Sequence, residues 1–122
     1  MPTLKRDVVK YVRDGAKSKY KKDDKCYICS EIEELDFHHY YSMTPLLNAW
    51  LKKTGYDPKF IKSVRDEFIE EHHKEVYEDT VTLCHTHHLK LHSIYGKNPG
   101  LHTATKQMRW VEIQREKHEL VR

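Results

Sequence analysis

The feature that most constrains this chain is the pairing of Cys26-x-x-Cys29 with Cys84-x-x-His87. A gap of two residues lets both side chains of a tight turn reach one ion, and two such pairs supply the four ligands that structural zinc prefers. The chain has 3 cysteines, an odd number that cannot be used up in disulfides within one chain. The sequence therefore predicts a structural Zn²⁺ ion bound by Cys26, Cys29, Cys84 and His87.

The length of 122 residues fits a single domain, 1–122, with no room for a second large core. Hydrophobic residues make up 38% and charged residues 34%, and the mean hydropathy is −0.87, so we expect a small core. Metal binding should then supply a large part of the folding free energy. The chain has no apolar run of about 18 residues and no apolar stretch of the secretory type near its N-terminus. We therefore expect an intracellular protein outside the membrane.

The charges are unevenly distributed along the chain. Residues 1–25 carry nine basic and four acidic side chains, residues 26–80 carry six and twelve, and residues 81–122 carry seven and three. Basic ends around an acidic middle suit a polyanionic partner. Solvated lysines on a plain surface explain the same distribution equally well.

Local signals predict an α+β chain with two short strands. Thr44-Pro45 and Asp57-Pro58 are helix starts, Gly55 is a helix stop, and the β-branched run at 80–83 is typical of a strand. A two-helix insertion, about 43–77, should therefore separate the strands, with a helix before them and a C-terminal helix at about 101–122. The expected helices are 4–14, 45–54, 58–76, 84–96 and 103–120, and the expected strands are 35–40 and 80–83.

Several of the 10 histidines form a second pattern. His88 and His92 are four residues apart, so they lie on one face of a helix and can bind one metal ion. The third ligand must come from elsewhere. Because adjacent strand residues point to opposite faces, His38 and His39 should divide between one metal ligand and one catalytic base.

Taken together, these motifs resemble a known family. The segments Asp36-Phe37-His38-His39 and Asp79 to Cys84, followed by His87-His88-x-x-x-His92 and preceded by the Cys26-x-x-Cys29 knuckle, resemble the HNH nucleases. The resemblance covers about 26–29, 36–40 and 78–96. It implies a ββα-metal core with a structural zinc, and the N-terminal helix, the insertion and the C-terminal helix lie outside it.

The resemblance also implies a role for each residue. His39 would be the general base that activates water, and His38, His88 and His92 would bind the catalytic metal. Asp79 stands where the family usually has Asn, and it would hold the imidazole of His39 in the required tautomer. The implied activity is metal-dependent DNA hydrolysis that leaves a 5′-phosphate and a 3′-hydroxyl, with Mg²⁺, Mn²⁺, Ni²⁺, Co²⁺ or Zn²⁺ as the catalytic ion.

DNA as the partner makes the lysines around these motifs candidate phosphate contacts. They are Lys17, Lys19, Lys21, Lys22, Lys90 and Lys97. The alternative function is a zinc-stabilised DNA-binding module without catalysis, which needs the zinc ligands but has no use for the four remaining histidines of the motifs. A compact basic nuclease suits a phage or a mobile element. Nicking, double-strand cutting, homing, restriction, packaging and branch resolution all remain open, as does the oligomeric state.

Overall fold

The computed structural model describes residues 7–120 of the chain. Strands β1 (Leu35–His39) and β2 (Thr80–Cys84) form a two-stranded antiparallel sheet. The longer helices are α1 (Val8–Lys17), α2 (Met43–Thr54), α3 (Ile61–Glu71), α4 (His85–Tyr95) and α5 (Ala104–Leu120). Short 3₁₀ turns lie at Pro58–Phe60 and Leu101–Thr103, and a π-helical turn at Lys74–Glu78. The predicted α+β class is confirmed.

The strand pair brings the two halves of the sequence motif together. Leu35 pairs with Cys84 and His39 with Thr80, so the end of β2 lies beside the start of β1. Helix α4 follows β2 without a loop, and its first turn therefore carries its histidines beside the sheet. None of the helices within residues 7–120 is long and apolar enough to cross a membrane.

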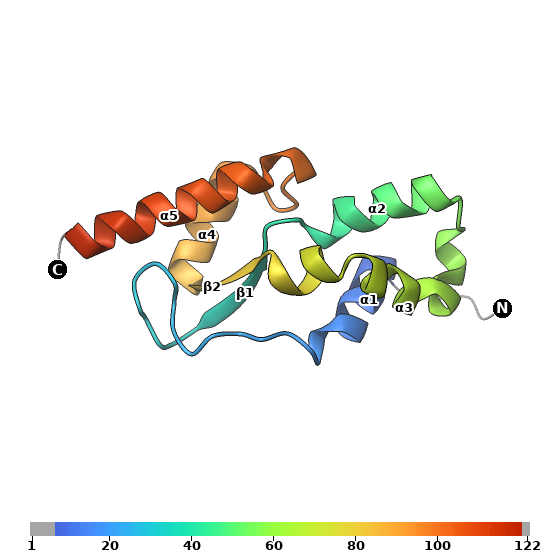
Figure 1. Cartoon of the computed structure of the whole chain (residues 1–122), viewed down its shortest axis with the longest axis horizontal. Helices are drawn as coiled ribbons and strands as arrows, with labels where there is room; N and C mark the ends of the chain where they lie inside the picture. Colours follow the sequence, from blue (N-terminus) through green and yellow to red (C-terminus); the bar gives the residue numbers. More distant parts are fainter. Residues whose placement is uncertain (1–6, 121–122) are drawn as a thin grey trace.

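Buried apolar side chains form two separate clusters. In Figure 1, helices α1, α2 and α3 lie towards one end of the long axis, and the sheet, α4 and α5 lie towards the other. The first cluster joins α1, α2 and α3 and includes Val12, Leu47, Trp50, Ile61 and Phe68. The second joins the sheet to α4 and α5, and two of its eight buried members are the thiols Cys26 and Cys84. The sheet thus belongs to the cluster that contains metal-ligand side chains, and the apolar helical cluster is separate from it.

Helix α1 runs later than its predicted span of 4–14. The Asp7 carboxylate accepts hydrogen bonds from the backbone N–H groups of Val9 and Lys10, which sets the start at Val8. Residues 4–6 lie outside the described part of the chain. The helix also continues through Gly15, where a Cβ atom would come within 2.6 Å of Arg65 Nε, so this glycine allows α1 to pack closely against α3.

The helix predicted over 58–76 is divided in the structure. A 3₁₀ turn precedes α3, which ends at Glu71, and a π-helical turn then covers Lys74–Glu78. The break turns Val76, which is 0% exposed, into the helical cluster while the chain continues directly into β2. Periodicity alone did not reveal the break because the apolar spacing continues through it.

Candidate active site and metal centres

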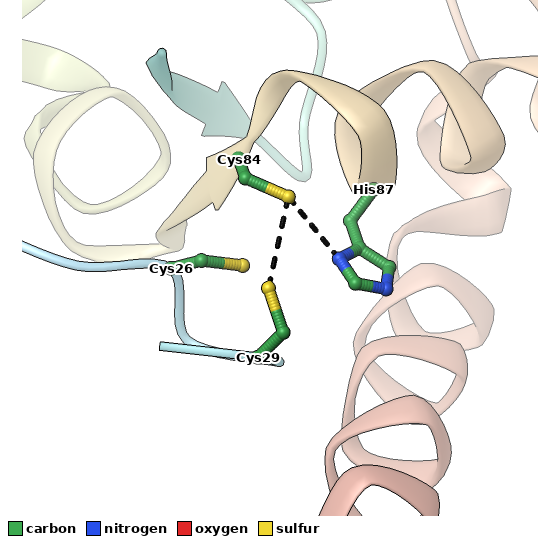
Figure 2. A group of neighbouring side chains, drawn as sticks. All are labelled: Cys26, Cys29, Cys84 and His87. Carbon is green, nitrogen blue, oxygen red and sulfur yellow. Dashed lines mark hydrogen bonds between the residues drawn. The ribbon is translucent and has the colours of Figure 1, made fainter. Parts of the chain in front are cut away.

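Four side chains from two distant segments converge on one point in Figure 2. Cys26 and Cys29 come from the loop before β1, Cys84 ends β2 and His87 lies in the first turn of α4. Their ligand atoms all lie within 4.8 Å of one another, so the four residues can hold one metal ion. These four residues are the predicted Cys-x-x-Cys and Cys-x-x-His pairs, which the sheet brings together.

The distances within this group suit a tetrahedral ion. Cys29 Sγ lies 3.8 Å from Cys84 Sγ, and Cys84 Sγ lies 3.2 Å from His87 Nδ1. Sulfur ligands about 2.3 Å from a tetrahedral zinc ion are separated by about 3.8 Å. Helix α5 also packs here, because the rings of His87 and His118 meet edge to face at 5.1 Å. The group is mostly buried, as a closed structural site requires.

The side chains of His38, His88 and His92 form a second group that can hold a metal ion. His88 Nε2 lies 3.2 Å from His38 Nδ1 and 3.0 Å from His92 Nε2. Nitrogen ligands about 2.0–2.1 Å from a tetrahedral ion are separated by about 3.3–3.4 Å, close to these distances. The structure therefore brings together the three histidines predicted as catalytic ligands.

The outer ring nitrogens of these histidines all have acceptors as partners. His88 Nδ1 donates to Asp36 Oδ2 at 3.0 Å, and His92 Nδ1 donates to the Gly96 carbonyl at 2.7 Å. His38 Nε2 donates to Gln107 Oε1 at 2.8 Å. Each inner nitrogen is then left with a lone pair, and the three lone pairs face one another. A bound cation would accept all three lone pairs and remove the repulsion between them.

Burial and charge keep the imidazoles of His38 and His88 neutral. Burial, together with the nearby His88, His92 and His39, lowers the pKa of His38 to about 3, although the hydrogen bond that His38 donates to Gln107 opposes the shift. Burial also lowers the pKa of His88, although its Asp36 partner opposes the shift. Neutral imidazole is the form that binds a metal ion, so the site is ready for one near neutral pH.

His39 is not part of the three-histidine group, and its ring packs against Tyr20 and Phe37. Its Nε2 donates to the Val76 carbonyl at 2.9 Å, and no hydrogen bond to Nδ1 occurs among residues 7–120. Burial lowers the pKa of His39 to about 4, with the Val76 bond opposing and the Arg13 charge adding to the decrease. The ring is therefore neutral at pH 7, with its lone pair on Nδ1.

One small pocket joins the base to the metal ligands. Its volume is about 190 Å³, and its wall includes His38, His39, His88, His92 and Arg13. A cleft of about 940 Å³ continues from it, since Arg13, Phe37, Lys97 and Asn98 line both spaces. The arrangement places a neutral imidazole beside a candidate cation site at the end of an open cleft.

Asp79 does not have the partner that the sequence predicted. Its carboxylate accepts from Lys74 Nζ at 2.8 Å through both oxygens, and its carbonyl accepts from the Tyr40 backbone N–H at 3.2 Å. The Val76 carbonyl holds His39 in its place. The expected contact between Asp79 and His39 is thus replaced by a backbone one, because the π-helical turn carries a carbonyl to the ring.

The candidate DNA contacts fall into three places. Lys17, Lys22 and Lys97 line the large cleft, together with Lys10 and Arg13. Lys19 and Lys21 line a different depression with His73, Tyr77 and Glu78. Lys90 is exposed on α4 and is not among the residues that line the cleft or the pocket. Half of the predicted lysines therefore line the cleft that adjoins the pocket of His39.

Three residues of the site were not predicted from the sequence. Gln107 and Arg13 had no assigned role, and Asp36 was quoted only as part of the motif. A signal for Gln107 exists, because it interrupts the apolar spacing of Ala104 and Val111 in α5. A signal for Arg13 also exists, since α1 repeats basic residues at Lys10, Arg13 and Lys17 with helical spacing.

Comparison with known protein families gives the family of this chain. The model of the phage T5 nicking endonuclease family matches residues 2–120, nearly the whole chain. The chain belongs to the nicking endonuclease family. Its family membership shows an endonuclease with DNA as the substrate. No solved structure matches the chain.

Proposed function

We propose that this nicking endonuclease is an HNH enzyme with a ββα-metal core made of β1, β2 and α4. The observation that carries the proposal is the small pocket whose lining includes both His39 and the three-histidine group. We assign Zn²⁺ to Cys26, Cys29, Cys84 and His87 as a structural ion. His38, His88 and His92 would hold the catalytic divalent ion, with Mg²⁺, Mn²⁺, Ni²⁺, Co²⁺ and Zn²⁺ as the candidates.

Hydrolysis of a phosphodiester needs a nucleophile and compensation for developing negative charge. A divalent ion bound by the three histidines supplies positive charge beside the scissile phosphate. His39 Nδ1 accepts the proton of the attacking water, while the Val76 carbonyl holds the opposite ring nitrogen as a donor. The negative charge of a bound phosphate would raise the pKa of His39 above its value of about 4, and the positive charge of the divalent ion would oppose that rise.

The cleft is the proposed path of the strand that is cut. Lys10, Arg13, Lys17, Lys22 and Lys97 line it, against the carboxylates of three aspartates. Those carboxylates are Asp7, Asp14 and Asp36. Because the cleft adjoins the pocket of His39, basic side chains along it could hold the phosphates of this strand next to the one that is cut. Arg13 stands where the two spaces meet, in position to bind a phosphate close to the scissile one.

Residues 7–120 contain one such pocket with one base, so each chain would cut one phosphodiester bond per binding event. This agrees with nicking and would leave a 5′-phosphate and a 3′-hydroxyl. For a phage enzyme, the place of action would be the infected host cell.

The direct test is incubation of supercoiled plasmid with the zinc-loaded protein and each candidate ion in turn. We expect open circles to accumulate before linear DNA, with ends that a ligase seals without further treatment. His88→Ala should remove this activity while the zinc content remains. Tight DNA binding without cleavage in every ion would instead favour the alternative, a zinc-stabilised DNA-binding module.

A paired lysine experiment tests the path. We expect Lys17→Gln with Lys97→Gln to weaken DNA binding and to lower the slope of log affinity against log salt by about 2, because each phosphate contact contributes about 0.9. Lys19→Gln with Lys21→Gln removes the same charge outside the cleft and is the control. Equal effects of the two pairs would contradict the proposed path.

A further inference from the structure

Gln107 is an unusual residue for the position it occupies. It is 0% exposed in α5, and its helical neighbours on the same face are the buried Ala104 and Val111. A buried amide destabilises a fold unless its polar atoms are hydrogen-bonded. Each polar atom of the Gln107 side chain has a partner within 3.2 Å, and one of these partners is His38.

The partners determine which way the amide faces. Gln107 Nε2 lies 3.2 Å from the Tyr40 carbonyl, which can only accept. It also lies 2.9 Å from Thr103 Oγ1, whose own proton is donated to the Gly100 carbonyl at 2.7 Å. Both contacts therefore require the NH₂ group of Gln107, and its Oε1 must face His38.

The orientation of the amide in turn determines the tautomer of His38. Since Gln107 Oε1 can only accept, His38 Nε2 must carry the ring proton across the 2.8 Å contact. His38 Nδ1 then presents its lone pair toward His88 Nε2, 3.2 Å away. The opposite tautomer would direct a proton into the centre of the three-histidine group and prevent metal binding there.

We propose that Gln107 is a positioning residue that holds His38 in its metal-binding tautomer. The inference rests on the proposed function, in which His38 is a ligand of the catalytic ion. It gives α5, which lies outside the recognised motif, a direct link to the chemistry. Partners of this kind behind a metal-binding histidine change metal affinity by about 10–100-fold when removed.

The first test measures metal binding rather than cleavage. Protein loaded with one equivalent of Zn²⁺ is titrated with Co²⁺ and followed by calorimetry and visible absorption. We expect Gln107→Met to weaken Co²⁺ binding about 10–100-fold, with zinc content unchanged. Gln114→Met makes the same substitution two turns later on α5 and should bind Co²⁺ like the wild type.

A conservative variant separates positioning from packing. Gln107→Glu keeps an oxygen acceptor facing His38 but loses the donors to Tyr40 and Thr103. Relative to the wild type, Gln107→Glu should therefore lose as much stability as Gln107→Met or more. It should nevertheless bind Co²⁺ more tightly than Gln107→Met does. The proposal would be overturned if Co²⁺ affinity in the two variants followed their melting temperatures instead of the presence of an oxygen acceptor at position 107.

A measurement on the wild type needs no variant to fold. Nitrogen-15 NMR of the histidine rings, with one equivalent of Zn²⁺ and no second ion, should show His38 protonated at Nε2. Protonation at Nδ1 would overturn the proposal. If the wild type binds Co²⁺ but does not nick plasmid, the proposed function is wrong and the role of Gln107 stands. If Gln107→Met binds Co²⁺ like the wild type, Gln107 has no such role and the proposed function stands.

Discussion

The two ends of this molecule are stabilised in different ways. The helical half, made of α1, α2 and α3, has a core of ten buried side chains that are all apolar in character, Phe68 and Trp50 among them. The metal half, made of β1, β2, α4 and α5 with the 26–29 loop, has eight buried members, and Cys26 and Cys84 are two of them. The comparison shows that the half with the smaller apolar core is the half that contains the candidate metal-ligating side chains.

The candidate active site is lined by residues from both halves. His39 belongs to β1, but its partner is the carbonyl of Val76, whose side chain lies in the helical core. Arg13 reaches the same pocket from α1. The metal half thus supplies the ligands and the base, and the helical half positions the base and lines the approach.

The largest effect should follow loss of the structural ion. Cys84→Ser removes a ligand shared by both short contacts of the site, at Cys29 Sγ and His87 Nδ1. Structural zinc sites contribute about 10–16 kcal/mol of apparent binding free energy, far more than a small core of this kind. We expect loss of bound zinc and of the folded metal half, seen as lost zinc by mass spectrometry and lost protection in amide exchange. An unchanged melting temperature would contradict the zinc site.

A cavity in the helical half should lower stability without loss of zinc. Phe68 is 0% exposed and its ring meets that of Trp50 edge to face at 5.3 Å, so Phe68→Ala should lower the free energy of unfolding by about 3–5 kcal/mol. Zinc content should be unchanged, because no ligand lies in this core. Phe60→Ala, at a half-buried position of the same segment, is the control and should cost less. Zinc loss in Phe68→Ala would show that the halves do not separate in this way.

Acid should destabilise the protein through its buried histidines. The pKa of His39 is lowered to about 4 by burial, against about 6.5 in an unfolded chain, so the unfolded state binds the proton more readily between these values. Stability is then complete above pH 6.5 and decreases as pH falls towards 4. Thermal melts across this window should show the decrease, and His39→Gln should flatten it.

The exposed His73 provides the comparison for that experiment. Its ring lies on the surface of the helical half, with Nδ1 3.3 Å from Glu78 Oε2 and the ring of Tyr77 beside it. His73→Gln should leave the pH dependence of the melting temperature nearly as in the wild type. An equal flattening in both variants would assign the effect to overall charge rather than to burial.

The smallest effect concerns one hydrogen bond of the helical half. Trp50 Nε1 donates to Glu71 Oε2 at 2.7 Å, and Trp50→Phe removes that donor. We expect a loss of about 0.5–1.5 kcal/mol in urea unfolding, since the exposed Glu71 can bind water instead. A change in zinc content or metal affinity would be inconsistent with the separation of the halves.

The sequence predicted those features that depend on local spacing. Cys26, Cys29 and Cys84 with His87 follow from two short gaps, and His88 with His92 follows from one helical turn. The sequence did not predict Gln107 or the Val76 carbonyl, because each acts from a segment whose position depends on tertiary packing. The resemblance implied that Asp79 contacts His39. In the structure the Asp79 carboxylate forms a salt bridge with Lys74 instead.

Nicking by His39→Ala tests the central claim most directly. The variant keeps all seven metal ligands, and its zinc content and Co²⁺ affinity should match those of the wild type. With supercoiled plasmid and the most active divalent ion, we expect the rate of open-circle formation to fall by about 10²–10⁴-fold, the usual contribution of a general base. His73→Ala should nick at the wild-type rate. Undiminished nicking by His39→Ala would contradict the assignment of His39 as the base.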